Sequence, residues 1–322
     1  PFWLTASNLG FRGRCRLGAM GGASSKPKAS DRTAAGLAKI RHCETIFPRE
    51  AGEKRLFEDP YAAHFYRGSS LVAMLPLGYF LRNATNVNAG MMHLLAGRTR
   101  EFDEQVLAAV AAGIRQVVIL GAGYDTRGFR LGLASDVRVI ELDQPDVQEK
   151  KRAALAGIAK LPKGENVHFL PIDFKVETPE KLHGVPGYDA SAPTLFLMEG
   201  VTQYIPKSAT AGTLKAVAAV CGPGSRFVAS YVPQDLWDAP DRCCKNPEDA
   251  QTLFKEVAKV GEPWISGWSR DEFAALMREH GFAVQRDITL PELIEEYYVP
   301  AGRQVPEEQR IAFERYAWAL KQ

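Results

Sequence analysis

The chain has 322 residues, 46% hydrophobic and 24% charged, a composition and length ordinary for one large globular domain or two modest ones. The net charge at pH 7 is only +2, so no broad basic surface is implied and nucleic acid is not an expected partner. The most apolar run, residues 71–81, is too short to span a bilayer and contains Pro76, so no transmembrane segment is predicted.

The first thirty residues carry five basic side chains and no acidic one. They are rich in Gly and Ser and lack core-forming periodicity, so we predict a disordered tail over residues 1–30. The stretch MGGASSK, which begins at Met20, matches the N-myristoylation pattern with Gly21 as the acceptor. One acyl chain gives only weak membrane association, and a cleaved Arg-rich targeting peptide is the alternative interpretation.

Three helices are predicted before the first strand. Residues 33–47 have apolar residues at helical spacing and end at Pro48. Residues 58–66 open a short helix, and residues 101–112 form a strongly amphipathic helix that Gly113 ends.

Strands and helices alternate after residue 113. Short apolar or β-branched runs that alternate with helices indicate a mostly parallel sheet covered on both faces. The predicted strands cover 116–120, 137–142, 166–172, 194–198 and 225–232, and the predicted helices cover 144–158 and 208–221.

The C-terminal part is predicted to complete the sheet. Residues 269–282 form a helix with Ser269 as its N-cap and Gly281 as its stop. Residues 283–288 and 313–321 are predicted closing strands. Residues 233–267 lack strong periodicity, so we interpret them as an insertion or lid over the sheet.

The five cysteines show neither CxxC spacing nor a histidine at zinc spacing. Unpaired thiols are typical of a reducing compartment, so we expect a cytoplasmic protein unless residues 1–30 direct it to a membrane or an organelle. No metal site is expected.

A glycine turn follows the first predicted strand. Gly121 and Gly123 match the first two glycines of the dinucleotide fingerprint GxGxxG, but Thr126 stands at the third position. That glycine normally allows close helix packing over a pyrophosphate, so its absence disfavours a nicotinamide or flavin cofactor. An adenosine joined to an amino-acid tail fits the turn better, because no diphosphate then needs a cradle.

Acidic residues follow three predicted strands. Glu141 and Asp143 lie 20 and 22 residues after Gly121, a distance typical of a carboxylate that binds ribose hydroxyls. Asp173 follows the third strand, where it and Phe174 could border an adenine. Glu199 ends the fourth strand, where a carboxylate needs a partner such as a ligand's ammonium group. The carboxyl ends of parallel strands share one edge, where ligands bind.

Together these stretches resemble the leucine carboxyl methyltransferase family, especially its bacterial-type branch. The resemblance runs from about residue 33 to the C-terminus, with LFEDPYAAHF and GRTREFDE similar to the family's N-terminal helical cap. It is carried by the motifs VVILGAGYDTRGFRL, VIELDQP, PIDF and MEGVTQYIP in that order.

The resemblance implies a class I methyltransferase fold, a Rossmann-like seven-stranded mostly parallel sheet with helices on both faces. Residues 31–322 would form one domain, with a helical cap over 31–113 and the sheet core over 114–322. The implied cofactor is S-adenosyl-L-methionine. By motif match, Arg98 would contact the carboxylate of the cofactor, and Arg100 is a close rival for that role. Gly121 would contact the methionine moiety, Asp143 the ribose and Glu199 the amine. Asp173 and Phe174 would contact the adenine.

The expected reaction is O-methylation of a carboxylate or hydroxyl of a small molecule or a protein C-terminus. A carboxylate acceptor is already ionised at neutral pH and needs no general base, whereas a hydroxyl would need one. Tyr204, five residues after Glu199, is the first candidate for contact with the acceptor. Two alternatives stay open: an NAD(P)-dependent oxidoreductase, and a non-catalytic, membrane-tethered adaptor that keeps a cofactor pocket.

Overall fold

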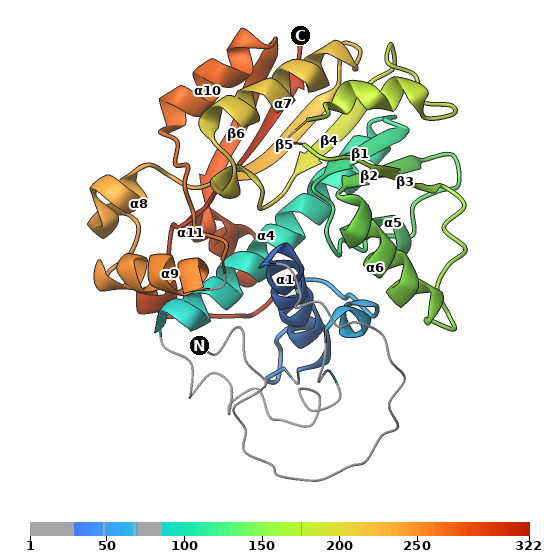
Figure 1. Ribbon diagram of the computed structural model, residues 1–322. Helices are drawn as coiled ribbons and strands as arrows, with labels where there is room; N and C mark the ends of the chain where they lie inside the picture. The colour runs from blue at the N-terminus through green and yellow to red at the C-terminus, as the bar shows by residue number, and fades with distance from the viewer. Residues whose placement is uncertain (1–28, 48, 67–68, 70–85, 175, 260) are drawn as a thin grey trace, which may run out of the picture.

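A seven-stranded sheet in the order β3-β2-β1-β4-β5-β7-β6 forms the centre of the computed structural model, which describes residues 29–47, 49–66, 69, 86–174, 176–259 and 261–322 (Figure 1). Strand β7 runs antiparallel to the other six strands. The strands are β1 (Gln116–Leu120), β2 (Arg138–Asp143), β3 (Val167–Pro171), β4 (Thr194–Met198), β5 (Arg226–Tyr231), β6 (Phe282–Thr289) and β7 (Arg315–Lys321). The seven strands predicted from the sequence are confirmed.

The helices surround this sheet, and short 3-10 or π turns, labelled η, connect some of them. The helices are α1 (Ala29–Ile46), α4 (Asn86–Ala111), α5 (Arg127–Arg130), α6 (Pro145–Ala156), α7 (Lys207–Ala219), α8 (Asp235–Asp238), α9 (Glu248–Lys259), α10 (Arg270–Glu279) and α11 (Leu290–Leu293). The η turns are η2 (Ala62–Phe65), η3 (Pro179–Gly184), η4 (Thr202–Tyr204), η5 (Pro240–Arg242), η6 (Ile294–Tyr298) and η7 (Glu307–Gln309).

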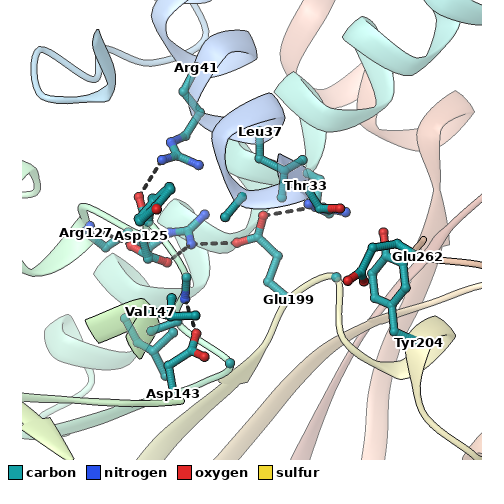
Figure 2. Close-up of a pocket in the computed structure, with 18 of the residues that line it drawn as sticks. Thr33, Leu37, Arg41, Asp125, Arg127, Asp143, Val147, Glu199, Tyr204 and Glu262 are labelled. Carbon is teal, nitrogen blue, oxygen red and sulfur yellow. Dashed lines mark hydrogen bonds and ion pairs between the residues drawn. The ribbon is translucent and has the colours of Figure 1, made fainter. Parts of the chain in front are cut away.

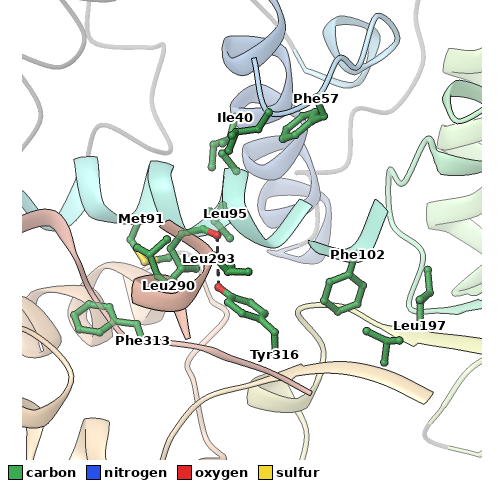
Figure 3. Packing of buried hydrophobic residues seen from close by; sticks show 14 of the residues in the cluster. Ile40, Phe57, Met91, Leu95, Phe102, Leu197, Leu290, Leu293, Phe313 and Tyr316 are labelled. Atoms are coloured by element: carbon green, nitrogen blue, oxygen red, sulfur yellow. Dashed lines mark hydrogen bonds between the residues drawn. The ribbon is translucent and has the colours of Figure 1, made fainter. Parts of the chain in front are cut away.

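Each face of the sheet packs against a different set of helices, because successive side chains of a strand point to opposite faces. Ile119 and Leu197 belong to the core on the face covered by α4, where Figure 3 shows Leu197 next to Phe102 of α4. Val118 and Phe196 point to the opposite face, which α7 and α10 cover. Both faces of the central strands are therefore buried, which explains their uninterrupted apolar sequences.

The predicted start of the helix over 101–112 is wrong, because α4 begins at Asn86. Gly90 and Gly97 weaken the local helical signal. Both glycines allow a segment from the C-terminal part to approach closely: a Cβ at Gly90 would lie 2.9 Å from the Gln309 carbonyl oxygen, and one at Gly97 would lie 3.3 Å from Leu293 Cδ1. This helix therefore depends on packing between distant parts of the chain.

The segment 233–267, whose sequence lacks strong periodicity, contains α8, η5 and α9. Helix α9 buries Ala250 and Leu253 on one face, while Trp237 stacks on Phe254 with ring centroids 4.9 Å apart. The predicted N-cap of α10 is confirmed, because Ser269 accepts a hydrogen bond from the Glu272 backbone in a capping box.

Residues 1–28 lie outside the described residues, and they include most of the predicted tail over 1–30 and the predicted acylation site Gly21. Within the described part of the chain, none of the helices combines the length and the apolar character needed to cross a membrane. Four cysteines in this part are buried free thiols: Cys43, Cys221, Cys243 and Cys244.

Candidate active site

A cavity of about 160 Å³ lies at the carboxyl ends of β1, β2 and β4 (Figure 2). The strand order reverses between β1 and β4, and ligands of open α/β sheets bind at such a point. Its wall is formed by Thr33, Ala34, Leu37, Arg41, Arg98, Ile119, Gly121, Ala122, Gly123, Tyr124, Asp125, Arg127, Arg130, Asp143, Val147, Glu199, Gly200, Tyr204 and Glu262.

The glycine turn forms the floor next to β1. Gly121 and Gly123 have positive φ angles of +68° and +47°, which side chains other than glycine rarely adopt. A Cβ at Gly121 would also lie 2.8 Å from Val201 Cγ2. The turn can therefore bring its backbone close to a ligand only with glycine at these positions.

The two acidic candidates of β2 have different surroundings. Asp143 lines the cavity, and its carboxylate accepts hydrogen bonds from the backbone N–H groups of Gly123 at 2.5 Å and Gln144 at 2.6 Å. Glu141 does not line the cavity: its side chain is fully buried and pairs with Lys151 of α6 at 2.5 Å. Burial raises the pKa of Glu141 to about 7, against the opposing charge of Lys151. Only Asp143 is placed to contact a ligand.

Asp173 and Phe174 follow β3 and do not line the cavity. The Asp173 backbone N–H donates to Glu177 Oε2 at 2.9 Å, and Phe174 packs against the core on the α7 and α10 face. The structure therefore does not bring these two candidates together with the other cavity residues.

Glu199 lies between two arginines, which sequence reasoning did not anticipate. One carboxylate oxygen accepts from Arg98 Nε at 2.9 Å and the other from Arg127 Nη1 at 2.6 Å (Figure 2). Burial alone would raise the pKa of Glu199, but the charges of Arg127 and Arg98 hold this pKa below its ordinary value. Glu199 is therefore an ionised carboxylate in a fixed orientation at the end of β4.

Arg98 rather than Arg100 lines the cavity. Besides Glu199, its guanidinium contacts Glu314, whose two oxygens both accept from Nη1 at 2.9 Å. Arg100 instead pairs with Glu104 at 2.5 Å and donates to the Leu56 carbonyl, with 37% of its side chain exposed. The expected bidentate contact with a cofactor carboxylate does not match this geometry, because two protein carboxylates already occupy the Nε and Nη1 groups of Arg98.

A second layer of ion pairs fixes the helix after the glycine turn. Arg127 donates to Asp103 at 2.7 Å and to Asp125 at 2.5 Å, and Arg130 pairs with Asp103 at 2.6 Å. Asp125, Arg127 and Arg130 belong to the stretch YDTRGFRL, and Asp103 belongs to α4. The charged residues of this motif were therefore visible in the sequence. Their pairing with Asp103 could not be deduced, because Asp103 lies on α4, 24 residues before Arg127.

Helix α1 covers the cavity. Thr33, Ala34, Leu37 and Arg41 recur at helical spacing and line it from above (Figure 2). Arg41 donates to the Tyr124 carbonyl at 2.6 Å and to Asp59 at 2.8 Å, which links the helix to the glycine turn.

Asp59 is fully buried and also accepts from the Thr126 hydroxyl at 2.7 Å. Thr126, at the third fingerprint position, is thus part of the connection between α1 and the glycine turn. A buried, hydrogen-bonded side chain takes the place where a dinucleotide site needs a bare glycine.

Tyr204 and Glu262 line the opposite side of the cavity from Arg127 and Asp143 (Figure 2). Burial raises the pKa of Tyr204 to about 12, so its phenol keeps its proton at neutral pH and can donate a hydrogen bond. Glu262 comes from the segment after α9 and was not a sequence candidate.

A family model described as leucine carboxyl methyltransferase matches residues 36–218, more than half of the chain. The chain belongs to the leucine carboxyl methyltransferase family. It is 34% identical over 291 residues to a "Putative S-adenosyl-L-methionine-dependent methyltransferase" of Mycolicibacterium paratuberculosis, covering 85% of this chain and 88% of the relative. A relative of the same name from Mycobacterium marinum is 32% identical over 292 residues, covering 86% and 89%.

Two solved structures share the fold. A DUF574 family protein from Streptomyces avermitilis has a TM-score of 0.57 at 14% identity, covering 88% of this chain and 97% of that one. A "putative methyltransferase" from Thermobifida fusca has a TM-score of 0.54 at 17% identity, covering 81% and 93%. The expected class I methyltransferase fold and the activity class, an S-adenosylmethionine-dependent methyltransferase, are confirmed at the level of the family.

The cavity of this methyltransferase fits an adenosyl amino acid. Asp143 offers carboxylate oxygens suited to a ribose diol, and the Glu199 oxygens, although paired with Arg98 and Arg127, keep acceptor lone pairs suited to an ammonium group. The four lining arginines are each hydrogen-bonded to protein carboxylates: Arg41, Arg98, Arg127 and Arg130. A diphosphate would therefore meet little uncompensated positive charge.

Proposed function

We propose that this methyltransferase transfers a methyl group from S-adenosylmethionine to a carboxylate or hydroxyl oxygen of a small molecule or a protein C-terminus. The single observation that carries the proposal is the shared cavity: Asp143, the Gly121 turn, Arg98, Glu199 and Tyr204 all line it. The nucleoside and the methyl acceptor would therefore share one cavity, as direct transfer of the methyl group requires.

Each lining residue has a proposed role toward the cofactor. Asp143 accepts from the ribose hydroxyls, and the backbone at Gly121 and Gly123 lies against the methionine moiety. Glu199 faces the amine, and Arg98 binds the carboxylate through Nη2. Asp173 and Phe174 remain proposed adenine contacts, supported by their position after β3, the strand next to β2.

S-adenosylmethionine supplies, when bound, a methyl group on a positively charged sulfur. The chain's own contribution is alignment, which can lower a barrier by roughly 7–11 kcal/mol. Helix α1 excludes water from above, and the carboxylates of Asp143 and Glu199 favour a cationic ligand. No metal is needed for these roles.

Tyr204 is proposed to orient the acceptor by donating a hydrogen bond to its reacting oxygen. Because its phenol stays protonated, Tyr204 is not the general base. A carboxylate acceptor needs no base, whereas a hydroxyl could transfer its proton to Glu262 on the same wall.

The proposal is tested by incubating the protein with methyl-labelled S-adenosylmethionine and a native extract, and then identifying the labelled product. Label released as methanol in mild base identifies a carboxyl ester, and base-stable label on oxygen identifies an ether. The Asp143→Ala variant is the control that should transfer little label. Label found only on nitrogen or carbon, or no transfer to any extract component, would contradict O-methylation.

Calorimetry separates this proposal from the oxidoreductase alternative. S-adenosylhomocysteine should bind and NAD should not, since Thr126 fills the position of the third fingerprint glycine. Binding of NAD alone would reverse the assignment. Binding of S-adenosylhomocysteine without methyl transfer would instead favour the non-catalytic adaptor.

A further inference from the structure

Glu314 lies immediately before β7 and outside every motif that identified the family. Its side chain is buried, with 1% exposed, and both oxygens accept from Arg98 Nη1 at 2.9 Å. Gln203 Nε2 donates to the same carboxylate at 3.2 Å. The residue before the C-terminal strand thus brings a buried carboxylate against Arg98, a cavity-lining residue that lies 216 residues away in the sequence.

Two carboxylates accept hydrogen bonds from the guanidinium of Arg98. Glu199 takes Nε and Glu314 takes Nη1, whereas Nη2 makes no hydrogen bond to any residue that the structure describes. Nη2 lies beside Gly200, where an added Cβ would be 3.2 Å from it. Arg98 therefore presents one N–H edge to the cavity, and the absent side chain of Gly200 keeps that edge accessible.

Glu314 is needed for this orientation. An arginine with a single carboxylate partner favours a bidentate contact through two of its nitrogens. If Glu314 did not hold Nη1, Arg98 could rotate toward Glu199 and use a second nitrogen there. Glu199 itself is fixed by Arg127, so the guanidinium is the group that would move.

We propose that Glu314 is a positioning residue that fixes the guanidinium of Arg98, so that its Nη2 edge receives the carboxylate of the cofactor's amino-acid end. This inference rests on the proposed function. It assigns no contact between Glu314 and the cofactor.

Calorimetry with two nucleosides tests the proposal. S-adenosylhomocysteine carries the amino-acid end, and 5′-methylthioadenosine lacks it. Glu314→Gln should weaken binding of S-adenosylhomocysteine by about tenfold or more, the loss expected for a displaced charge-assisted hydrogen bond, and change that of 5′-methylthioadenosine by less than about twofold. Glu104→Gln is the matched control, because Glu104 pairs with Arg100 on the exposed side of the same helix; it should change neither affinity.

An equal loss for both nucleosides, or no loss for either, would overturn the positioning role. If the wild-type protein binds neither nucleoside, the proposed function itself fails, which is a different result. Should Glu314→Gln fail to fold, Glu314→Asp keeps the charge but shortens the side chain. It should show the same selective loss, and equal weakening of both nucleosides would again overturn the proposal.

Discussion

Asp143 and Glu141 point to the same face of β2, yet only Asp143 opens onto the cavity, because Lys151 of α6 covers Glu141. Two residues along a strand correspond to about 6.6 Å, which separates the rim of the sheet from its buried interior. Asp143→Ala should therefore weaken binding of S-adenosylhomocysteine by more than about tenfold, roughly 1.4 kcal/mol, while the fold persists. Calorimetry would measure the affinity, and circular dichroism would show whether the fold persists. An unchanged affinity would show that Asp143 does not bind the ribose.

Glu141→Gln should act on stability and its pH dependence rather than on affinity. The pKa of Glu141 is raised by burial from 4.5 to about 7, so the folded state binds more protons than the unfolded state between these values. The Glu141 contribution to the free energy of unfolding is therefore fully present below pH 4.5 and is lost as the pH rises toward 7. Urea unfolding from pH 4.5 to 7 should show a flatter dependence in the variant. Parallel curves would contradict this.

Gly121→Ala should destabilise the protein more than Gly132→Ala does. Both glycines have positive φ, +68° and +62°, so each substitution carries the left-handed backbone penalty of about 1–2 kcal/mol. Only at Gly121 would the methyl group meet Val201, at 2.8 Å, while nothing lies within 4 Å of it at Gly132. The extra cost should be about 1–3 kcal/mol in urea unfolding, together with a loss of S-adenosylhomocysteine binding. Equal effects of the two substitutions would show that the turn tolerates a side chain.

Tyr204→Phe should separate methyl transfer from cofactor binding. The variant loses one hydrogen bond to the acceptor, so the transfer rate should fall about tenfold while S-adenosylhomocysteine affinity changes by less than about twofold. Because burial raises the pKa of Tyr204 to about 12, the phenol should not titrate in the wild-type rate profile below about pH 11. A rate that rises in alkaline solution and loses this rise in Tyr204→Phe would make Tyr204 a base instead.

The sheet could be predicted from the sequence because its strands are local signals. The runs 116–120 and 194–198 are apolar after their first residues, Gln116 and Thr194, and they agree with the ends of β1 and β4. The glycine turn was equally local, since Gly121 and Gly123 are needed for their own φ angles.

The first half of α4 and the charge network could not be predicted in the same way. Gly90 weakens the helical pattern locally. A glycine is needed there because the Gln309 backbone, from a distant part of the sequence, packs closely against it. Glu199 was expected to need a positive partner, but its two arginines come from α4 and α5. Such pairings depend on the assembled fold, and no local pattern in a single sequence contains them.

The crystal structure of the protein with S-adenosylhomocysteine tests the central claim most directly. We predict that the ribose contacts the Asp143 carboxylate, that the amine faces Glu199, and that the carboxylate of the ligand lies on Arg98 Nη2. A nucleoside bound elsewhere, with the cavity between α1 and the glycine turn empty, would contradict it.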